Sequence, residues 1–115
     1  MDKVDKNTEA KIQQLQMFEQ SLTNLLSQRQ QFQTQLIEVE SALTEIKDTP
    51  SVYKIVGNIM VSGDKQKIEK DLRSKKEVVQ LRIKNLEKQE DQIKEKAKKI
   101  QTEVMQEMKS GEKDD

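Results

Sequence analysis

Apolar residues recur at heptad spacing from about residue 8 to residue 47. With Leu15 placed at position a, apolar a and d positions continue for more than four heptads and are interrupted only by Arg29. Arg29 either extends its charged end out of the seam or helps to fix the register of the helices. The pattern predicts a long coiled-coil helix over residues 1–47. Its seam positions are Leu15, Phe18, Leu22, Leu25, Arg29, Phe32, Leu36, Val39, Leu43 and Ile46.

A second stretch, residues 64–109, has a similar but weaker repeat, and Asp64 is placed to cap its first turn. Two helices of matched length that each carry one apolar stripe are expected to pack antiparallel, because this buries both stripes. Residues 110–115 are expected to form a mobile tail. The seven-residue row is Leu72, Val79, Leu86, Ile93 and Ile100, and its companion row is Ile83, Ala97 and Val104, with interruptions at Lys76 and Glu90.

The segment between the helices, residues 48–63, has a different character. Pro50 cannot continue a helix, so the first helix should stop near Lys47. The run VYKIVGNIMV then places Gly57-Asn58 between two apolar stretches, which suits a two-residue type II′ turn. This segment therefore predicts a single β-hairpin.

The predicted hairpin is apolar on both faces, and its own helices could cover at most one of them. A two-stranded hairpin is marginally stable in water, and its open edges can recruit other strands. We therefore predict that hairpins from several chains join into a closed β-structure. The alternative is a local β-tab folded onto its own helices. The predicted oligomerisation residues are Val52, Tyr53, Ile55, Val56, Gly57, Ile59, Met60 and Val61.

Composition narrows the possible functions. The chain is 37% charged and 3% aromatic, which suits a narrow seam better than a globular core. It has no His and no Cys, so the sequence predicts no catalytic residues, no metal site and no cofactor. Net charge is zero, which argues against a nucleic-acid or membrane partner. The first residues have no apolar secretion signal, and an intracellular location fits the absence of Cys.

Apolar residues also gather near both chain ends, which the antiparallel arrangement would bring together. Some of them, such as Ile12, Met17 and Met105, fall off the seam stripes. Methionine is flexible and polarizable, which suits surfaces that bind varied apolar partners. The alternative is ordinary seam with scattered surface residues. The candidate client-binding residues are Val4, Ala10, Ile12, Leu15, Met17, Ile100, Val104, Met105 and Met108.

The hairpin motif VYKIVGNIMV between two coiled-coil helices, together with LEKQE at 86–90, resembles the prefoldin family, in particular its archaeal β-type subunits. The resemblance covers nearly all of residues 1–115 as one prefoldin-like domain. It implies a mainly α fold with a small β element. Two long helices form an antiparallel coiled coil and are joined by one β-hairpin, and this hairpin assembles with others into an oligomeric β-barrel.

The resemblance also implies a function. Two α-type and four β-type subunits would form a cytoplasmic hetero-hexamer, an ATP-independent chaperone that holds unfolded proteins at its coiled-coil tips and delivers them to a group II chaperonin. Residues 53–61 would carry assembly, and the apolar residues near both termini would carry client capture.

Two other functions remain open from the residues alone. The basic second helix, which has 14 basic and 10 acidic residues over 64–109, could be an RNA-binding arm. The acidic residues interleaved along it, such as Glu87 and Asp91, argue against that function. A passive coiled-coil scaffold would share the same fold and have no client.

Overall fold

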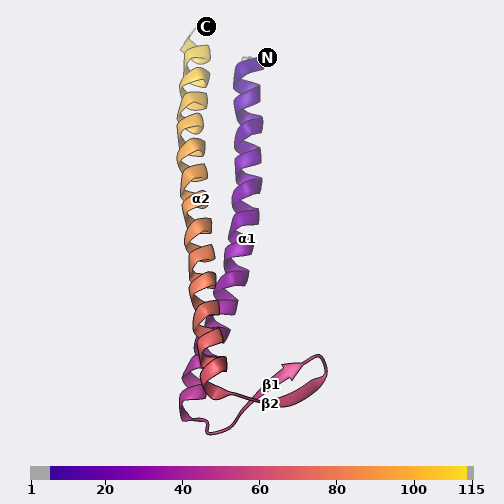
Figure 1. Ribbon diagram of the computed structural model, residues 1–115. Coiled ribbons are helices and arrows are strands. Elements are labelled where there is room, and N and C mark those ends of the chain that lie inside the picture. Colours follow the sequence, from indigo (N-terminus) through magenta and orange to yellow (C-terminus); the bar gives the residue numbers. More distant parts are fainter. Residues whose placement is uncertain (1–5, 114–115) are drawn as a thin grey trace. The chain divides into compact units, whose positions relative to one another are not determined.

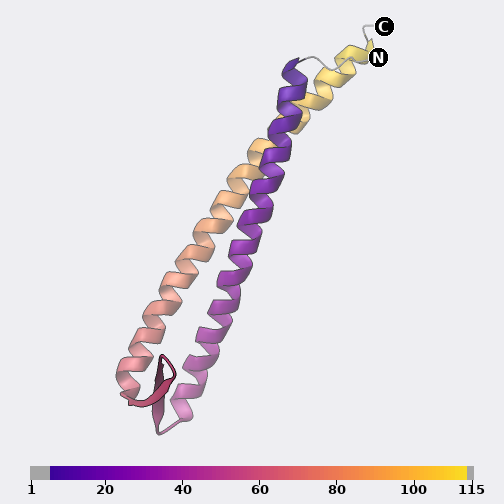
Figure 2. The same ribbon diagram turned by 90° about the vertical axis from the view of Figure 1, so that its right-hand side faces the viewer.

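The computed structural model describes residues 6–113, and the side chains of residues 6–110. The elements follow in the order α1 (Lys6–Asp48), β1 (Val52–Val56), β2 (Ile59–Gly63) and α2 (Lys65–Lys113) (Figures 1 and 2). Two long helices joined by one antiparallel hairpin confirm the predicted order of elements.

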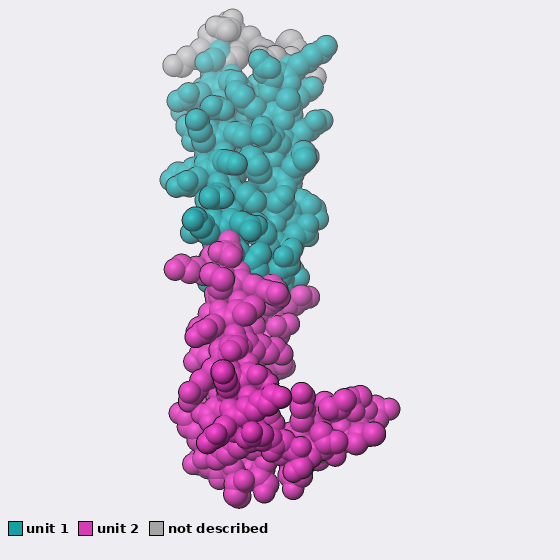
Figure 3. Space-filling view, viewed as in Figure 1, with its two compact units in different colours: residues 1–28, 86–115 teal, residues 29–85 magenta. Residues whose placement is uncertain are grey.

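The chain divides into two compact units, each with a stretch of both helices (Figure 3). Unit 1 comprises Met1–Gln28 and Leu86–Asp115, and unit 2 comprises Arg29–Asn85. Within each unit, the stretch of α1 lies beside the stretch of α2 and runs in the opposite direction (Figures 1 and 2).

The seam of unit 1 follows the predicted heptad positions. On α1, Leu15 and Phe18 are half-buried, as are the next two seam leucines. On α2, Leu86 and Val104 are each 7% exposed. Glu90, which interrupts the apolar row in the sequence, is 6% exposed and so belongs to the buried strip. One face of each helix is therefore withdrawn from water, as the spacing predicts.

The seam of unit 2 is the better buried of the two on α1. Val39 and Ile46 of α1 are each 5% exposed, and on α2 Val79 is 2% and Ile83 8% exposed. Arg82 of α2 lies over the ring of Phe32 with its guanidinium carbon 5.4 Å from the ring centroid. This cation–π contact covers an aromatic ring that the narrow seam leaves half-buried.

Side chains satisfy the backbone groups left open where α1 ends. The hydroxyl of Thr49 donates to the Glu45 carbonyl at 2.8 Å, and Lys65 Nζ donates to the Lys47 carbonyl at 3.3 Å. Pro50 follows and cannot extend the helix. The helix stops one residue after the predicted position.

The predicted cap of α2 is confirmed. The backbone amide of Gln66 donates to the Asp64 side chain at 3.1 Å, and the amide of Ile68 donates to the Asp64 carbonyl at 2.9 Å. These are the side-chain cap and the first helical hydrogen bond expected of an N-cap residue.

The end of α2 differs from the prediction. The helix runs to Lys113 instead of ending at residue 109. A single glycine, Gly111, costs a helix only about 1 kcal/mol relative to alanine, and no proline follows it. Residues 114–115 of the predicted mobile tail lie outside the described residues.

The hairpin has the predicted register. Val56 pairs with Ile59, Ile55 with Met60, and the ladder continues to Val52 opposite Gly63. Gly57 has φ +63°, and Asn58 has a negative φ, the combination of a type II′ turn. The turn therefore needs a residue without a Cβ at Gly57 only.

We expect Gly57→Ala to destabilise the hairpin by about 1–2 kcal/mol, because alanine is strained in the left-handed region. The measurement is the urea concentration at which the assembled protein dissociates. Asn58→Ala is the matched control, since its backbone already suits an L-residue. Equal midpoints for the two variants would contradict a type II′ turn in the assembled state.

Candidate functional site

The first candidate surface is the hairpin surface, defined as the eight predicted oligomerisation residues. Its six large apolar side chains after Val52 are between 40% and 69% exposed, and Val52 itself is half-buried. These six are Tyr53, Ile55, Val56, Ile59, Met60 and Val61. The chain's own helices leave this surface largely in water, so the structure does not show the alternative of a covered β-tab.

The two faces of the hairpin have different surroundings within unit 2. Strand alternation places Tyr53, Ile55 and Met60 on one face, and Val56 and Ile59 on the other. The Tyr53 face borders two open grooves of about 470 and 620 Å³, both also lined by apolar residues of the neighbouring helix ends. The helix residues that line the smaller groove include Ile46, Ile68 and Leu72. Apolar side chains of another chain could therefore enter the grooves beside the Tyr53 face and pack against the Val56 face.

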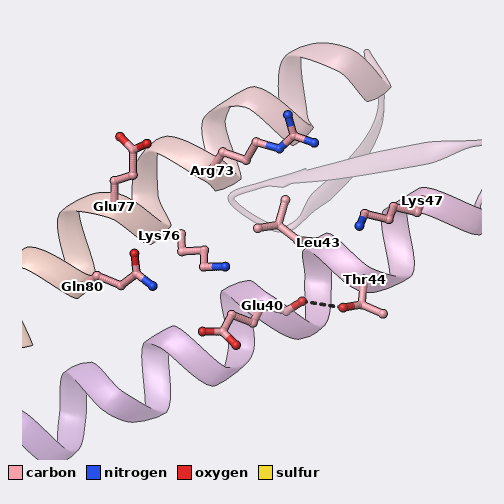
Figure 4. Close-up of a pocket in the computed structure, with 8 residues that line it drawn as sticks. All are labelled: Glu40, Leu43, Thr44, Lys47, Arg73, Lys76, Glu77 and Gln80. Atoms are coloured by element: carbon pink, nitrogen blue, oxygen red, sulfur yellow. Dashed lines mark hydrogen bonds between the residues drawn. The ribbon is translucent and has the colours of Figure 1, made fainter.

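A third groove, of about 460 Å³, lies farther along the helices of unit 2 (Figure 4). Its lining combines Lys47 and Lys76 with Glu40 and Glu77, so its charges are mixed in sign. Arg73 also lines it and pairs with Glu69 at 2.6 Å. An open groove with mixed charge provides no dry site in which a reactive group would be perturbed.

The second candidate surface is the tip surface, the part of unit 1 near both chain ends. Met17 is 70% exposed, Met105 58% and Met108 49%. Met105 and Met108 are three residues apart on α2, so they lie on the same side of that helix. Three thioether side chains therefore supply apolar area that the seam does not use.

The other predicted tip residues vary in burial. Ala10 is exposed, whereas Ile12, Leu15 and Ile100 are half-buried. Val104 is 7% exposed because it faces the seam, so it offers almost no surface and we remove it from the candidate client-binding set. Val4 lies outside the described residues.

A polar cluster near the same end of unit 1 was not predicted from the sequence. Thr8, which is 3% exposed, donates from its hydroxyl to Glu107 Oε2 at 2.8 Å. Lys11 Nζ donates to Glu107 Oε1 at 2.6 Å and lies 3.6 Å from Glu103 Oε2. We call these four residues the tip clamp. Glu103 and Glu107 are one turn apart, and that spacing could have indicated a shared basic partner on the other helix.

Within the tip clamp, the pKa of Lys11 lies above its ordinary value. The hydrogen bond with Glu107 raises the pKa of Lys11 above its ordinary value of 10.5, against the opposing effect of desolvation. A raised lysine pKa stabilises the folded state below the unfolded pKa, and this contribution is lost only as pH rises through the folded value. The clamp is therefore expected to weaken in alkaline solution and not near neutrality.

We expect Thr8→Val to loosen the ends of the helices in unit 1. Valine keeps the shape but loses the hydrogen bond to Glu107, at a cost of about 1 kcal/mol, or roughly fivefold in local opening. Amide hydrogen exchange of the first turns of α1 and the last turns of α2 would measure the change. Thr102→Val is the control, because its exposed hydroxyl donates only to the Lys98 carbonyl of its own helix. Equal exchange in the two variants would contradict the clamp.

Apolar side chains on the helices outside both candidate surfaces were also not singled out from the sequence. Leu26, Ile37, Val78 and Leu81 are between 40% and 66% exposed. Single exposed apolar residues are common on protein surfaces. These residues therefore serve as comparison positions for the two candidate surfaces.

Other kinds of site have little support in the described part of the chain. Over residues 6–113, no group of three His, Cys, Asp or Glu side chains is arranged to hold a metal ion. Neither α1 nor α2, as far as each is described, contains an apolar stretch long enough to cross a bilayer.

Comparison with known proteins gives a consistent result. A family model described as prefoldin subunit matches residues 9–111. The prefoldin subunit beta of Archaeoglobus fulgidus is 40% identical over 88 residues, which cover 74% of this chain and 76% of that protein. The prefoldin subunit beta of Thermococcus kodakarensis is 33% identical over 107 residues, 90% of this chain and 92% of that protein.

A solved structure agrees with these relatives. The crystal structure of the prefoldin beta subunit from Thermococcus strain KS-1 matches with a TM-score of 0.86 at 32% identity, covering 92% of this chain and 96% of that one. The family model spans most of the chain, and the match to the solved structure covers nearly all of both chains. The chain therefore belongs to the prefoldin family of chaperone subunits, within which it resembles the β-type.

Proposed function

We propose that the chain is a subunit of an ATP-independent holdase that binds unfolded proteins and delivers them to a group II chaperonin. The complex would contain two α-type and four β-type subunits and act in the cytoplasm. The observation that carries the proposal is the exposure of large apolar side chains at the hairpin and at the chain ends of unit 1. Membership of a family of chaperone subunits, which are not enzymes, supports it.

The hairpin surface is the proposed assembly element. Fully burying a large apolar side chain contributes about 1.5–3 kcal/mol, and this hairpin offers six that are 40–69% exposed. Together they can supply about 5–11 kcal/mol, which is of the same order as the association cost of about 4–15 kcal/mol. Both strands also have a free edge in the two-stranded sheet. Closing several hairpins into a β-barrel would bury the side chains and pair the edges at once.

The tip surface is the proposed client-binding element. An exposed methionine loses only about 1–2 kcal/mol of unfavourable hydration when a client covers it, so a single contact is weak. Several coiled coils that contact one unfolded chain raise the avidity by roughly 10²–10⁴. Since each contact remains weak, release requires no nucleotide. Thioether side chains demand no hydrogen-bond pattern from the client, which accounts for low sequence selectivity.

The proposal is tested by the aggregation of a chemically unfolded client diluted into buffer without nucleotide. The complex of this chain with a prefoldin α-type partner is expected to keep the client in solution. It should also raise the yield of folded client when a group II chaperonin and ATP are added later. Aggregation at the rate of the client alone would reject the holdase function and favour a passive scaffold.

A further inference from the structure

The described methionines all lie on the two exposed apolar surfaces. Met17, Met105 and Met108 belong to the tip surface, and Met60, which is 65% exposed, belongs to the hairpin surface. The seam positions of the described residues contain no methionine, since they are filled mainly by Leu, Ile, Val and Phe. These four thioethers are therefore separated from the packing that holds the two helices together.

This distribution matters because a thioether can be oxidised where an aliphatic side chain cannot. The sulfur lone pair attacks one oxygen of a peroxide, the S–O bond forms as the O–O bond breaks, and the peroxide is reduced to water. The sulfur is oxidised to a sulfoxide, which is polar where the thioether was apolar. The change is reversible by reduction. Exposure of 49–70% leaves the side chains of Met17, Met105 and Met108 accessible to a small oxidant.

We propose that Met17, Met105 and Met108 are three oxidation sites of the tip surface, at which sulfoxide formation switches off client capture without unfolding the chain. The inference rests on the proposed holdase function and adds a reversible chemical control to the same surface. Oxidation would replace the apolar area of the tip with groups that prefer water. It would leave the seam intact, because none of the three sulfurs occupies a seam position.

Met60 provides an internal comparison. It pairs across the hairpin with Ile55, on the face that borders the apolar grooves. In an assembled complex, the proposed hub would cover Met60 and slow its oxidation, whereas the three tip methionines would remain accessible. We therefore predict that peroxide oxidises the three tip methionines of the assembled protein before it oxidises Met60.

The experiment uses the assembled complex with an α-type partner, treated with hydrogen peroxide until peptide mass spectrometry finds the three tip methionines oxidised. Client capture is measured as suppression of aggregation, helix content by circular dichroism and assembly by light scattering. We expect capture to fall about tenfold or more, because every arm that carries this chain loses contacts at once. Helix content and mass should remain unchanged, and reduction by methionine sulfoxide reductases should restore capture.

The matched control is the triple variant Met17→Leu, Met105→Leu and Met108→Leu. Leucine keeps a similar apolar volume and cannot be oxidised to a sulfoxide, so peroxide treatment should not change the level of capture that the variant shows before treatment. Loss of capture by the peroxide-treated variant would overturn the proposal, because the group that peroxide inactivates would then lie elsewhere in the complex.

Three other results are decisive. Full capture by the oxidised wild-type complex would overturn the switch and leave the holdase function standing. Failure of the three sulfurs to react faster than Met60 would contradict the assigned site. A wild-type complex that cannot suppress aggregation before oxidation would instead reject the holdase function, and the switch with it.

Discussion

Replacing Val56 or Ile59 with aspartate is expected to disperse the oligomer into smaller species. The two residues are cross-strand partners on one face of the hairpin and are 56% and 65% exposed in the single chain. If assembly buries this face, each substitution removes apolar burial and places a carboxylate where it has no partner. The combined cost is about 3 kcal/mol or more, which corresponds to roughly 10²-fold in the dissociation constant. The effect repeats in every copy that carries the substitution.

The measurement is mass by light scattering or native mass spectrometry, with and without an α-type partner. Leu81→Asp is the matched control, because Leu81 is 59% exposed on α2 and lies outside the hairpin surface. The control should assemble normally. A mass that does not change for Val56→Asp and Ile59→Asp would show that the hairpin is not the assembly element.

Replacing Met17, Met105 and Met108 together with serine is expected to reduce suppression of client aggregation about tenfold or more, with assembly unchanged. The three side chains are 49–70% exposed, so the substitutions remove client contact area and leave the seam in place. The loss should exceed the sum of single substitutions, because avidity multiplies small changes over several arms. Truncation of residues 1–15 or of residues 101–115 is expected to weaken capture in the same direction.

The control is the variant Ile37→Ser with Leu81→Ser, which removes side chains of similar exposure from the helices of unit 2. Client aggregation is followed by light scattering, and assembly by mass in the same samples. If the control loses capture as strongly as the triple variant, client binding is not concentrated at the tip surface. Undiminished capture by the triple variant and by both truncations would refute client binding at the tips.

Features that depend on neighbouring residues were predictable from the sequence. The stop of α1 near Pro50, the turn at Gly57-Asn58 and the cap at Asp64 each follow from the backbone geometry that one residue type allows or forbids. The heptad spacing likewise predicted which face of α1 is withdrawn from water. The far end of α2 was less predictable, because a lone glycine weakens a helix without forcing it to stop.

The extent of exposure at the tip surface needed the structure. The heptad spacing placed Val104 in a seam row and Met105 outside it, and the structure gives exposed fractions of 7% and 58% for the two residues. Spacing did not give the burial of Ile12, which lies off the seam stripe and is nevertheless half-buried. The tip clamp also could not be predicted from the sequence, since Thr8 and Glu107 are 99 positions apart and meet only through the antiparallel register.

By itself, the sequence determined two helices, their single apolar stripe and the hairpin between them, because these depend on residue spacing and local backbone preference. The tertiary structure decided how far the apolar side chains outside the seam are exposed, that Glu90 is buried within the seam, and that the hairpin is left uncovered by its own helices. Burial depends on what packs opposite a side chain, and residues distant in the sequence supply that partner.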